Sequence, residues 1–239
     1  MNDVAVRTLR IPDHAAAAAA RAEVLDADEA SRAAEFQDSA ARERYVTAHV
    51  GLRVLLGARL EVAPQSVEFV REPCGMPDCE LPHGRPAVAG RPDVRFSLSH
   101  AGDFALYALA ESPVGADIES AELARDGFAR MLRRLHPAEQ QAVAALSVEL
   151  REAALLGCWV RKEAYLKGIG TGLPGGVGRR HVGLPAEFAP RDAPPVPAGW
   201  SVVDVPAPDG YRAAIAVRRQ DGAPDGDAPR LRAAELRLE

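Results

Sequence analysis

The chain has 239 residues, of which 47% are apolar and 26% charged, as expected for a globular protein with one large domain or two small lobes. Its formal net charge of −5 argues against a nucleic-acid-binding protein. The alanine run at 15–20 is too short to cross a bilayer and lacks the pattern of a signal peptide. Three cysteines, an odd number, are typical of a reducing compartment, so we expect a cytoplasmic protein without a membrane segment.

The first third of the chain predicts a strand followed by two helices. Residues 4–11 alternate in part between apolar and polar side chains, which favours a strand. A helix is predicted at 26–40, because Asp26 and Glu29 have the spacing of a capping box. A stronger helix is predicted at 41–60, where apolar residues recur near every 3.6 positions.

The rest of the chain alternates short apolar runs, turn residues and helical segments. A long loop is predicted at 71–93 because Pro and Gly are dense there, and 104–110 fits a helix or a strand. Strands are predicted at 67–70, 95–98 and 114–118, helices at 121–135, 138–150 and 151–167, short strands within 181–218, and a strand or helix at 230–238.

Three acidic residues in two separate segments carry most of the chemical information. Asp117 and Glu119 are two residues apart in a predicted strand, so both carboxylates point to one face. Glu163 lies in a predicted helix with Lys167 one turn further on, and the chain's other lysine, Lys162, lies beside it. Three oxygen ligands with a lysine nearby suit a Mg²⁺ site that handles a phosphorylated substrate.

Three sequence blocks occur in a specific order. Phe96–Asp103 contains Ser-x-Ser-His, Gly115–Glu119 reads Gly-Ala-Asp-Ile-Glu, and Trp159–Leu173 contains Trp-Val-Arg-Lys-Glu-Ala-Tyr-Leu-Lys followed by glycines. Together they resemble the phosphopantetheinyl transferases of the large, two-lobed type that activates peptide synthetases and polyketide synthases. The resemblance covers roughly residues 20–175 by motif, and Ser97 stands where many members of that family carry Asn.

The resemblance implies an α+β fold of two similar lobes in one chain, related by pseudo-twofold symmetry. The first lobe, 1–112, would contact the phosphates of coenzyme A, and the second, 113–239, would hold the metal site and the catalytic helix. Because the pseudo-twofold pairing is then internal to one chain, we expect a monomer.

The implied reaction transfers phosphopantetheine from coenzyme A to a serine of an apo acyl or peptidyl carrier protein. It would depend on Mg²⁺, release adenosine 3′,5′-bisphosphate and serve secondary metabolite biosynthesis. By position in the motifs, Asp117, Glu119 and Glu163 would ligate the metal. Glu163 would also act as the base, and Lys167 would stabilise the leaving group, whereas Lys162 is expected to have only a supporting role.

Four further residues are implied to bind the nucleotide part of coenzyme A. His100 would contact a phosphate, Arg85 the nucleotide end, and Arg44 the 3′-phosphate, with Arg32 nearby. The alternatives are a His100 that lies in a turn capped by Ser99, and arginines that are surface charges.

Alternative functions use the same residues. Asp117, Glu119 and Glu163 would also suit a Mg²⁺-dependent phosphodiesterase in which water is the nucleophile. A degenerate protein that only binds coenzyme A or a carrier would have no need of all three carboxylates together with Lys167.

Two segments outside these blocks allow more than one interpretation. Cys74, Cys79 and His83 could form a zinc loop, although their spacing is loose and a fourth ligand is not evident. An apolar stripe with flanking arginines at 128–134 fits either a face packed on the core or a docking surface for an acidic carrier protein.

Overall fold

The computed structural model describes residues 3–74, 84–172, 176–191, 196–220 and 228–238. Within these residues helices and strands mix throughout, as an α+β fold requires. The helices are α1 (Ile11–Ala19), η1 (Ala22–Val24), α2 (Ala27–Glu35), α3 (Ser39–Leu60), η2 (Pro64–Ser66), α4 (Ala121–Arg134), α5 (Pro137–Ala145) and α6 (Val148–Ile169). The strands are β1 (Asp3–Arg10), β2 (Phe69–Arg71), β3 (Pro86–Val88), β4 (Arg95–Ala101), β5 (Phe104–Ala110), β6 (Val114–Ser120), β7 (Trp200–Val205), β8 (Tyr211–Arg218) and β9 (Arg230–Glu235).

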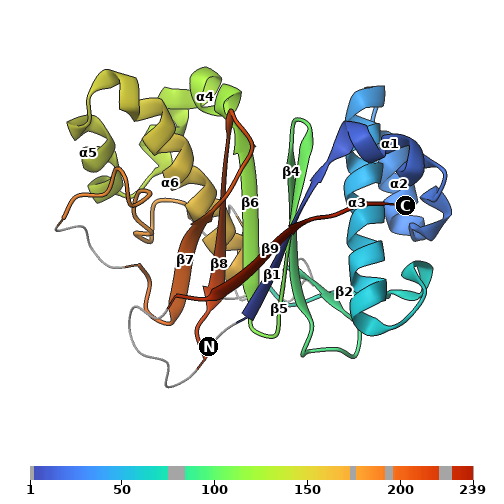
Figure 1. Cartoon of the computed structure of the whole chain (residues 1–239). Coiled ribbons are helices and arrows are strands. Elements are labelled where there is room, and N and C mark those ends of the chain that lie inside the picture. Colours follow the sequence, from blue (N-terminus) through green and yellow to red (C-terminus); the bar gives the residue numbers. More distant parts are fainter. Residues whose placement is uncertain (1–2, 75–83, 173–175, 192–195, 221–227, 239) are drawn as a thin grey trace.

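Two larger sheets lie at the centre of the molecule, with helices on their outer faces (Figure 1). The first sheet has the strand order β4-β5-β1-β9 and the second β6-β8-β7, while β2 and β3 form a separate hairpin-like pair. Helices α1–α3 cover the outer face of the first sheet, and α4–α6 cover the outer face of the second (Figure 1). The chain therefore forms four layers, in the order helix, sheet, sheet, helix.

An apolar core fills the space between the two sheets. It contains Val4, Val6 and Leu106 from the first sheet and Ile118 and Ile215 from the second, all of them buried. These residues alternate along their strands with residues that face the helical layers, as the two-residue period of a strand requires. Burial on both faces explains why β5 is an almost continuous apolar run.

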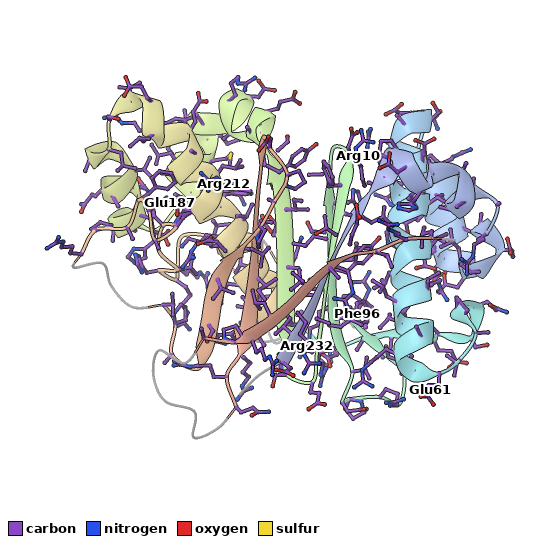
Figure 2. All side chains as sticks on the ribbon, viewed as in Figure 1. Arg10, Glu61, Phe96, Glu187, Arg212 and Arg232 are labelled. Atoms are coloured by element: carbon purple, nitrogen blue, oxygen red, sulfur yellow. The ribbon has the colours of Figure 1, made fainter. Side chains whose placement is uncertain are left out.

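A helix packs on each outer face through its own cluster of apolar side chains. Between the first sheet and α3, Leu52 and Leu56 pack with Phe96, which Figure 2 labels in this region. Between the second sheet and α6, Leu155 and Val160 form part of a cluster that also contains apolar side chains of α4. Strands of one layer and helices of the next thus bring segments that are distant in sequence within reach of each other.

The C-terminal strand returns to the first sheet. Strand β9 pairs in parallel with β1, and Arg232, which Figure 2 labels, forms a 2.5 Å ion pair with Asp3 of β1. The lobe boundary predicted between residues 112 and 113, and the pseudo-twofold relation of the lobes, stay predictions. None of the helices formed by the described residues is long and apolar enough to span a membrane.

Most predicted elements are present, with differences at their ends. The capping box of Asp26 and Glu29 is present, but α2 ends at Glu35, where Phe36 turns to an extended conformation. The predicted helix at 138–150 ends at Ala145, and the helix predicted at 151–167 begins earlier, at Val148. Helix α1 has no counterpart among the sequence predictions, and the long loop predicted at 71–93 contains strand β3.

The apolar stripe of α4 packs against the core. Met131 is buried, and Phe128 and Leu132 contact the cluster beneath α6, so the interpretation as a core-facing stripe is confirmed. The guanidinium of Arg134 lies 5.6 Å from the ring centre of Trp159 on α6. This cation–π contact joins an arginine of α4 to α6.

Candidate active site

The site forms where β4 of the first sheet faces β6 of the second. Two serines on β4 face β6, because they alternate along the strand. Ser97 Oγ accepts a 2.9 Å hydrogen bond from the backbone N–H of Ala116, and Ser99 Oγ donates a 2.8 Å bond to Asp117 Oδ1. His100 also belongs to β4, where it pairs with Ala105 of β5, so it does not lie in a turn capped by Ser99.

Asp117 and Lys167 form an ion pair at this seam. Lys167 Nζ on α6 lies 2.6 Å from Asp117 Oδ1 and donates a 2.9 Å hydrogen bond to Ser99 Oγ. Asp117 is only 2% exposed, while the lysine side chain is 32% exposed. Burial raises the pKa of Asp117, and the neighbouring ammonium of Lys167 opposes that rise. The ammonium is therefore held at the edge of the site, with access to solvent.

Glu119 and Glu163 lie close enough to Asp117 to respond to its charge. Burial raises the pKa of Glu119 to about 8, repulsion from Asp117 and Glu163 adds to the rise, and Lys167 opposes it. Burial likewise raises the pKa of Glu163 to about 7, again with a contribution from Asp117, while Lys167 and Arg134 oppose it. The structure thus brings the three predicted carboxylates and Lys167 into one electrostatically coupled group.

A glycine on β6 allows α6 to approach that strand closely. A Cβ added at Gly115 on β6 would lie 2.0 Å from the carbonyl oxygen of Ala164 and 2.4 Å from the backbone nitrogen of Gly168. Both atoms belong to the backbone of α6, which cannot swing away as a side chain can. The close approach places Glu163 and Lys167 of α6 opposite the carboxylates of β6.

A cavity of about 450 Å³ opens beside this group. Its lining includes Lys167, His100 and Arg85, which are three of the predicted ligand-binding residues. Although His100 is exposed to solvent, many protein atoms surround its ring, and this partial desolvation lowers its pKa. The positive charges of Lys167 and Arg44 lower it further, so Arg44 also lies within electrostatic range of this wall.

Arg85 contacts both Glu72, which follows β2, and the last turn of α6. Its Nε lies 2.5 Å from Glu72 Oε2, and its Nη1 donates a 2.5 Å hydrogen bond to the carbonyl oxygen of Gly168 near the end of α6. Glu72 also pairs with Arg95. The guanidinium is thereby oriented by one carboxylate and one helix-end carbonyl.

The two remaining predicted arginines lie on α2 and α3, the helices that cover the first sheet. Arg44 forms a 3.6 Å ion pair with Asp38 and is partly exposed. Arg32 is exposed, pairs with Glu35 at 2.6 Å, and does not belong to the lining of the cavity. Its guanidinium instead lies over the ring of Phe36, with 5.3 Å to the ring centre.

Lys162 faces away from the site, as its position beside Glu163 on a helix suggests. It is buried and lies 2.6 Å from Glu139, which is also buried. Glu139 accepts further hydrogen bonds from the backbone nitrogens of Val182 and Gly183. The pair therefore holds the segment after α6 against α5, which is a structural role.

Sequence reasoning did not single out three residues of the site. Ser99 joins the Asp117–Lys167 pair, and its two-residue spacing from Ser97 on a strand was the available signal. His49 and Arg71 line the cavity. His49 lies within the helix predicted at 41–60, and Arg71 ends β2 where the sequence predicts the start of the loop at 71–93, so no periodicity marks it as functional.

The carboxylates fit a divalent cation by their chemistry. Asp117 Oδ2 is buried and has no hydrogen-bond partner among the described residues, and Glu119 and Glu163 add further hard oxygen donors next to it. Within the described ranges, however, no three His, Cys, Asp or Glu side chains are assembled closely enough to hold a metal ion without rearrangement. Lys167 supplies the positive charge at Asp117 in this conformation.

The cysteine-containing loop is only partly within the described residues. Cys74 is buried and has a free thiol, whereas Cys79 and His83 lie outside the described residues, so the zinc interpretation stays open. Cys158 on α6 is fully buried in an apolar cluster, where it packs as a small apolar residue.

Comparisons with known proteins identify the family. The family model of the 4′-phosphopantetheinyl transferase superfamily matches residues 113–215. The chain is 30% identical to the 4′-phosphopantetheinyl transferase HetI of Nostoc sp. over 197 residues, which are 82% of this chain and 79% of that protein. It is 28% identical to slr0495 of Synechocystis sp. over 156 residues, but spans only 60% of that protein's length. It also resembles the 4′-phosphopantetheinyl transferase Sfp of Bacillus subtilis, at 28% identity over 96 residues, 38% of this chain and 40% of that protein.

The similarity to HetI extends well beyond the matched segment 113–215, since it covers most of both chains. The Gly-x-Asp-x-Glu and Trp-x-x-Lys-Glu blocks lie inside that segment, and the structure joins them through the contact of β6 with α6. From this agreement between the matched sequences and the geometry, the chain belongs to the 4′-phosphopantetheinyl transferase superfamily.

Proposed function

We propose that this chain transfers phosphopantetheine from coenzyme A to the serine hydroxyl of an apo carrier protein. The observation that carries the proposal is the group formed by Asp117, Glu119, Glu163 and Lys167 beside a cavity of about 450 Å³. Such a cavity is large enough for part of a nucleotide-containing ligand. Its cationic lining, which includes Arg71 and the predicted residue Arg85, suits the phosphates of coenzyme A, and the imidazole of His100 on the same lining adds a hydrogen-bonding group.

We assign the three carboxylates Asp117, Glu119 and Glu163 to a Mg²⁺ site. A bound Mg²⁺ would neutralise the pyrophosphate and the charge that develops on it during transfer. The buried oxygen Asp117 Oδ2 supports this assignment, because an unpartnered buried carboxylate oxygen is costly unless a cation binds to it.

Glu163 and Lys167 act on opposite ends of the reacting group. The serine oxygen forms a bond to the phosphorus that carries pantetheine, the bridging P–O bond of the pyrophosphate breaks, and Glu163 receives the serine proton. Lys167 has a solvent-accessible ammonium on the same face of α6, one turn on, and stabilises the negative charge on the leaving group. The leaving group departs as adenosine 3′,5′-bisphosphate.

The nucleotide part of coenzyme A binds toward the first lobe. Arg85 is already oriented into the cavity by Glu72 and Gly168, and His100 lies on the same lining. We assign Arg44 to the 3′-phosphate, and the effect of its charge on the pKa of His100 supports this assignment. Arg32 contributes only if the exposed pair with Glu35 opens. We expect the enzyme to act as a monomer in the cytoplasm, on carrier proteins of secondary metabolite biosynthesis.

Intact-mass spectrometry tests the reaction directly. An apo peptidyl or acyl carrier protein is incubated with this protein, coenzyme A and Mg²⁺, and a gain of about 340 Da that EDTA abolishes is expected. A matched incubation uses a carrier in which alanine replaces the acceptor serine, and it should show no gain. Release of adenosine 3′,5′-bisphosphate without modification of any carrier would instead indicate a phosphodiesterase. Binding of coenzyme A without either reaction would indicate a degenerate binding protein.

A further inference from the structure

A histidine on α3 lines the same cavity as the cationic residues. His49 lies in the wall of the 450 Å³ cavity together with Arg71, Arg85 and Lys167. It belongs to the first lobe's long helix, which Figure 1 shows on the outer side of the first sheet, whereas α6 lies beyond the second sheet. His49 thus enters the cavity wall from α3, whereas Lys167 enters it from α6.

The hydrogen bonding of His49 defines which ring nitrogen carries the proton. Nδ1 lies 2.8 Å from the carbonyl oxygen of Tyr45, one turn earlier on α3. A carbonyl oxygen can only accept a hydrogen bond, so Nδ1 must be the donor. In the neutral ring the other nitrogen, Nε2, is then unprotonated and can only accept.

The ring stays neutral at physiological pH. Burial lowers the pKa of His49 to about 4, the hydrogen bond to Tyr45 opposes that shift, and electrostatic interactions with His100 and Arg53 lower the pKa further. His49 therefore adds no positive charge for binding phosphate. It differs in this respect from the arginines and the lysine of the same cavity.

Stacking holds the ring in a defined position. The rings of His49 and Tyr45 stack with their centres 3.8 Å apart and their planes 25° apart, and Phe36 packs against Tyr45 at 5.4 Å. Arg32 covers the outer face of Phe36. A ring fixed in this way presents its acceptor nitrogen with little loss of side-chain entropy on binding.

An acceptor in a cavity otherwise rich in N–H donors is complementary to a donor group on the ligand. Pro86, Phe96 and Leu98 give the cavity an apolar lining that suits a planar base, while Arg71 and Arg85 suit phosphates. Coenzyme A carries N–H donors both on its adenine and on its pantetheine arm. The pantetheine arm must reach the transfer centre at Glu163 and Lys167, which leaves the adenine for the α3 end.

We propose that Nε2 of His49 accepts a hydrogen bond from the exocyclic amine of adenine, so that His49 selects the adenine nucleotide of coenzyme A. This inference rests on the proposed function, because it takes coenzyme A as the substrate. A site built to bond a polar group discriminates against analogues that lack it, since its own acceptor is then left unpaired. His49 is in this sense a specificity-determining residue, separate from the residues that hold the phosphates.

The test compares two enzymes with two substrates. The substrates are coenzyme A and an analogue in which hydrogen replaces the exocyclic amine of adenine. The variant His49→Phe keeps an aromatic ring that can stack on Tyr45 but removes the acceptor. In the wild-type protein, kcat/KM for the analogue is expected to be about tenfold lower than for coenzyme A. In the variant the two substrates are expected to have nearly equal values, because only the value for coenzyme A falls.

A control and an independent readout make the test decisive. Tyr45→Phe keeps both the stacked ring and the backbone carbonyl, so its ratio between the two substrates should equal the wild-type ratio, and thermal unfolding checks that each variant is folded. A tenfold preference that persists in His49→Phe, or a wild-type protein without a preference, overturns the inference. If no carrier is modified, the proposed function fails, but the inference about His49 can still be tested. Dissociation constants of coenzyme A and the analogue are then measured by calorimetry for the wild-type protein and for His49→Phe. Absence of coenzyme A binding to the wild-type protein overturns both.

Discussion

The close contact between β6 and α6 makes Gly115→Ala a sensitive test of how the site is assembled. The added Cβ would lie 2.0 Å from the carbonyl oxygen of Ala164, and Cβ atoms essentially never approach closer than 3.0 Å. Strand and helix must therefore separate by about 1.0 Å at this point. Since Asp117 lies on one element and Lys167 on the other, that separation falls directly on the 2.6 Å ion pair between them.

The expected result of Gly115→Ala is a large loss of turnover with a moderate loss of stability. A misplacement of about 1 Å in a catalytic constellation typically costs about 100-fold in rate. Overpacking of this kind typically costs about 1–3 kcal/mol in the free energy of unfolding. The assay is kcat for carrier modification by mass spectrometry, combined with thermal unfolding to obtain Tm.

Gly127→Ala provides the matched control. Gly127 lies within α4, and its added Cβ would meet the side chain of Arg130 at 3.3 Å, which is flexible and can move. This variant should keep full turnover and gain about 0.4–1 kcal/mol, because alanine restricts the unfolded chain. Wild-type turnover and an unchanged Tm in Gly115→Ala would refute the argument that the contact with α6 positions the catalytic group.

Four further predictions concern the charged residues of the site and the buried Lys162–Glu139 pair. Asp117→Ala should abolish Mg²⁺-dependent transfer and leave a folded protein by circular dichroism, and near-normal activity would exclude Asp117 as a metal ligand. Lys167→Ala should lower kcat more than it weakens coenzyme A binding, and an effect on affinity alone would reassign the lysine to ground-state binding. Because the folded-state pKa of Glu119 is raised from 4.5 to about 8, its contribution to stability is lost as pH rises through that interval. Mg²⁺ should accordingly raise Tm more at pH 8 than at pH 6, and equal shifts would contradict a site made of these carboxylates. Lys162→Met should lower the free energy of unfolding by about 3–5 kcal/mol, since it leaves the buried Glu139 unpaired, and a neutral effect in urea denaturation would disprove the structural role.

Local patterns identified most of the regular elements. The partly alternating apolar residues of β1, the capping box of α2 and the apolar stripe of α3 depend on neighbours within a few positions, and all three elements are present. The ends were less accurate where tertiary packing decides. Helix α2 ends at Glu35 instead of residue 40. The interruption between α5 and α6 lies at Leu146–Ser147, whereas the sequence predicted it after residue 150.

The motif residues could be named from their order in the chain, but not their mutual geometry. Asp117 and Glu119 share a strand face by local spacing alone, and Glu163 and Lys167 share a helix face. That these two pairs meet depends on the close approach of β6 and α6 at Gly115, between segments almost fifty residues apart. The catalytic and ligand roles of these residues stay predictions until the variants are measured.

The sequence by itself determined the family resemblance, the strand and helix that carry the carboxylates, and the identity of Lys167 as the lysine of the site. Only the tertiary structure decided that Ser99 joins the Asp117–Lys167 pair, and that His49 and Arg71 line the cavity. Periodicity reports which face of an element a residue occupies. It does not report which face of another element lies opposite, because that depends on the packing of two sheets and two helical layers made from distant parts of the chain.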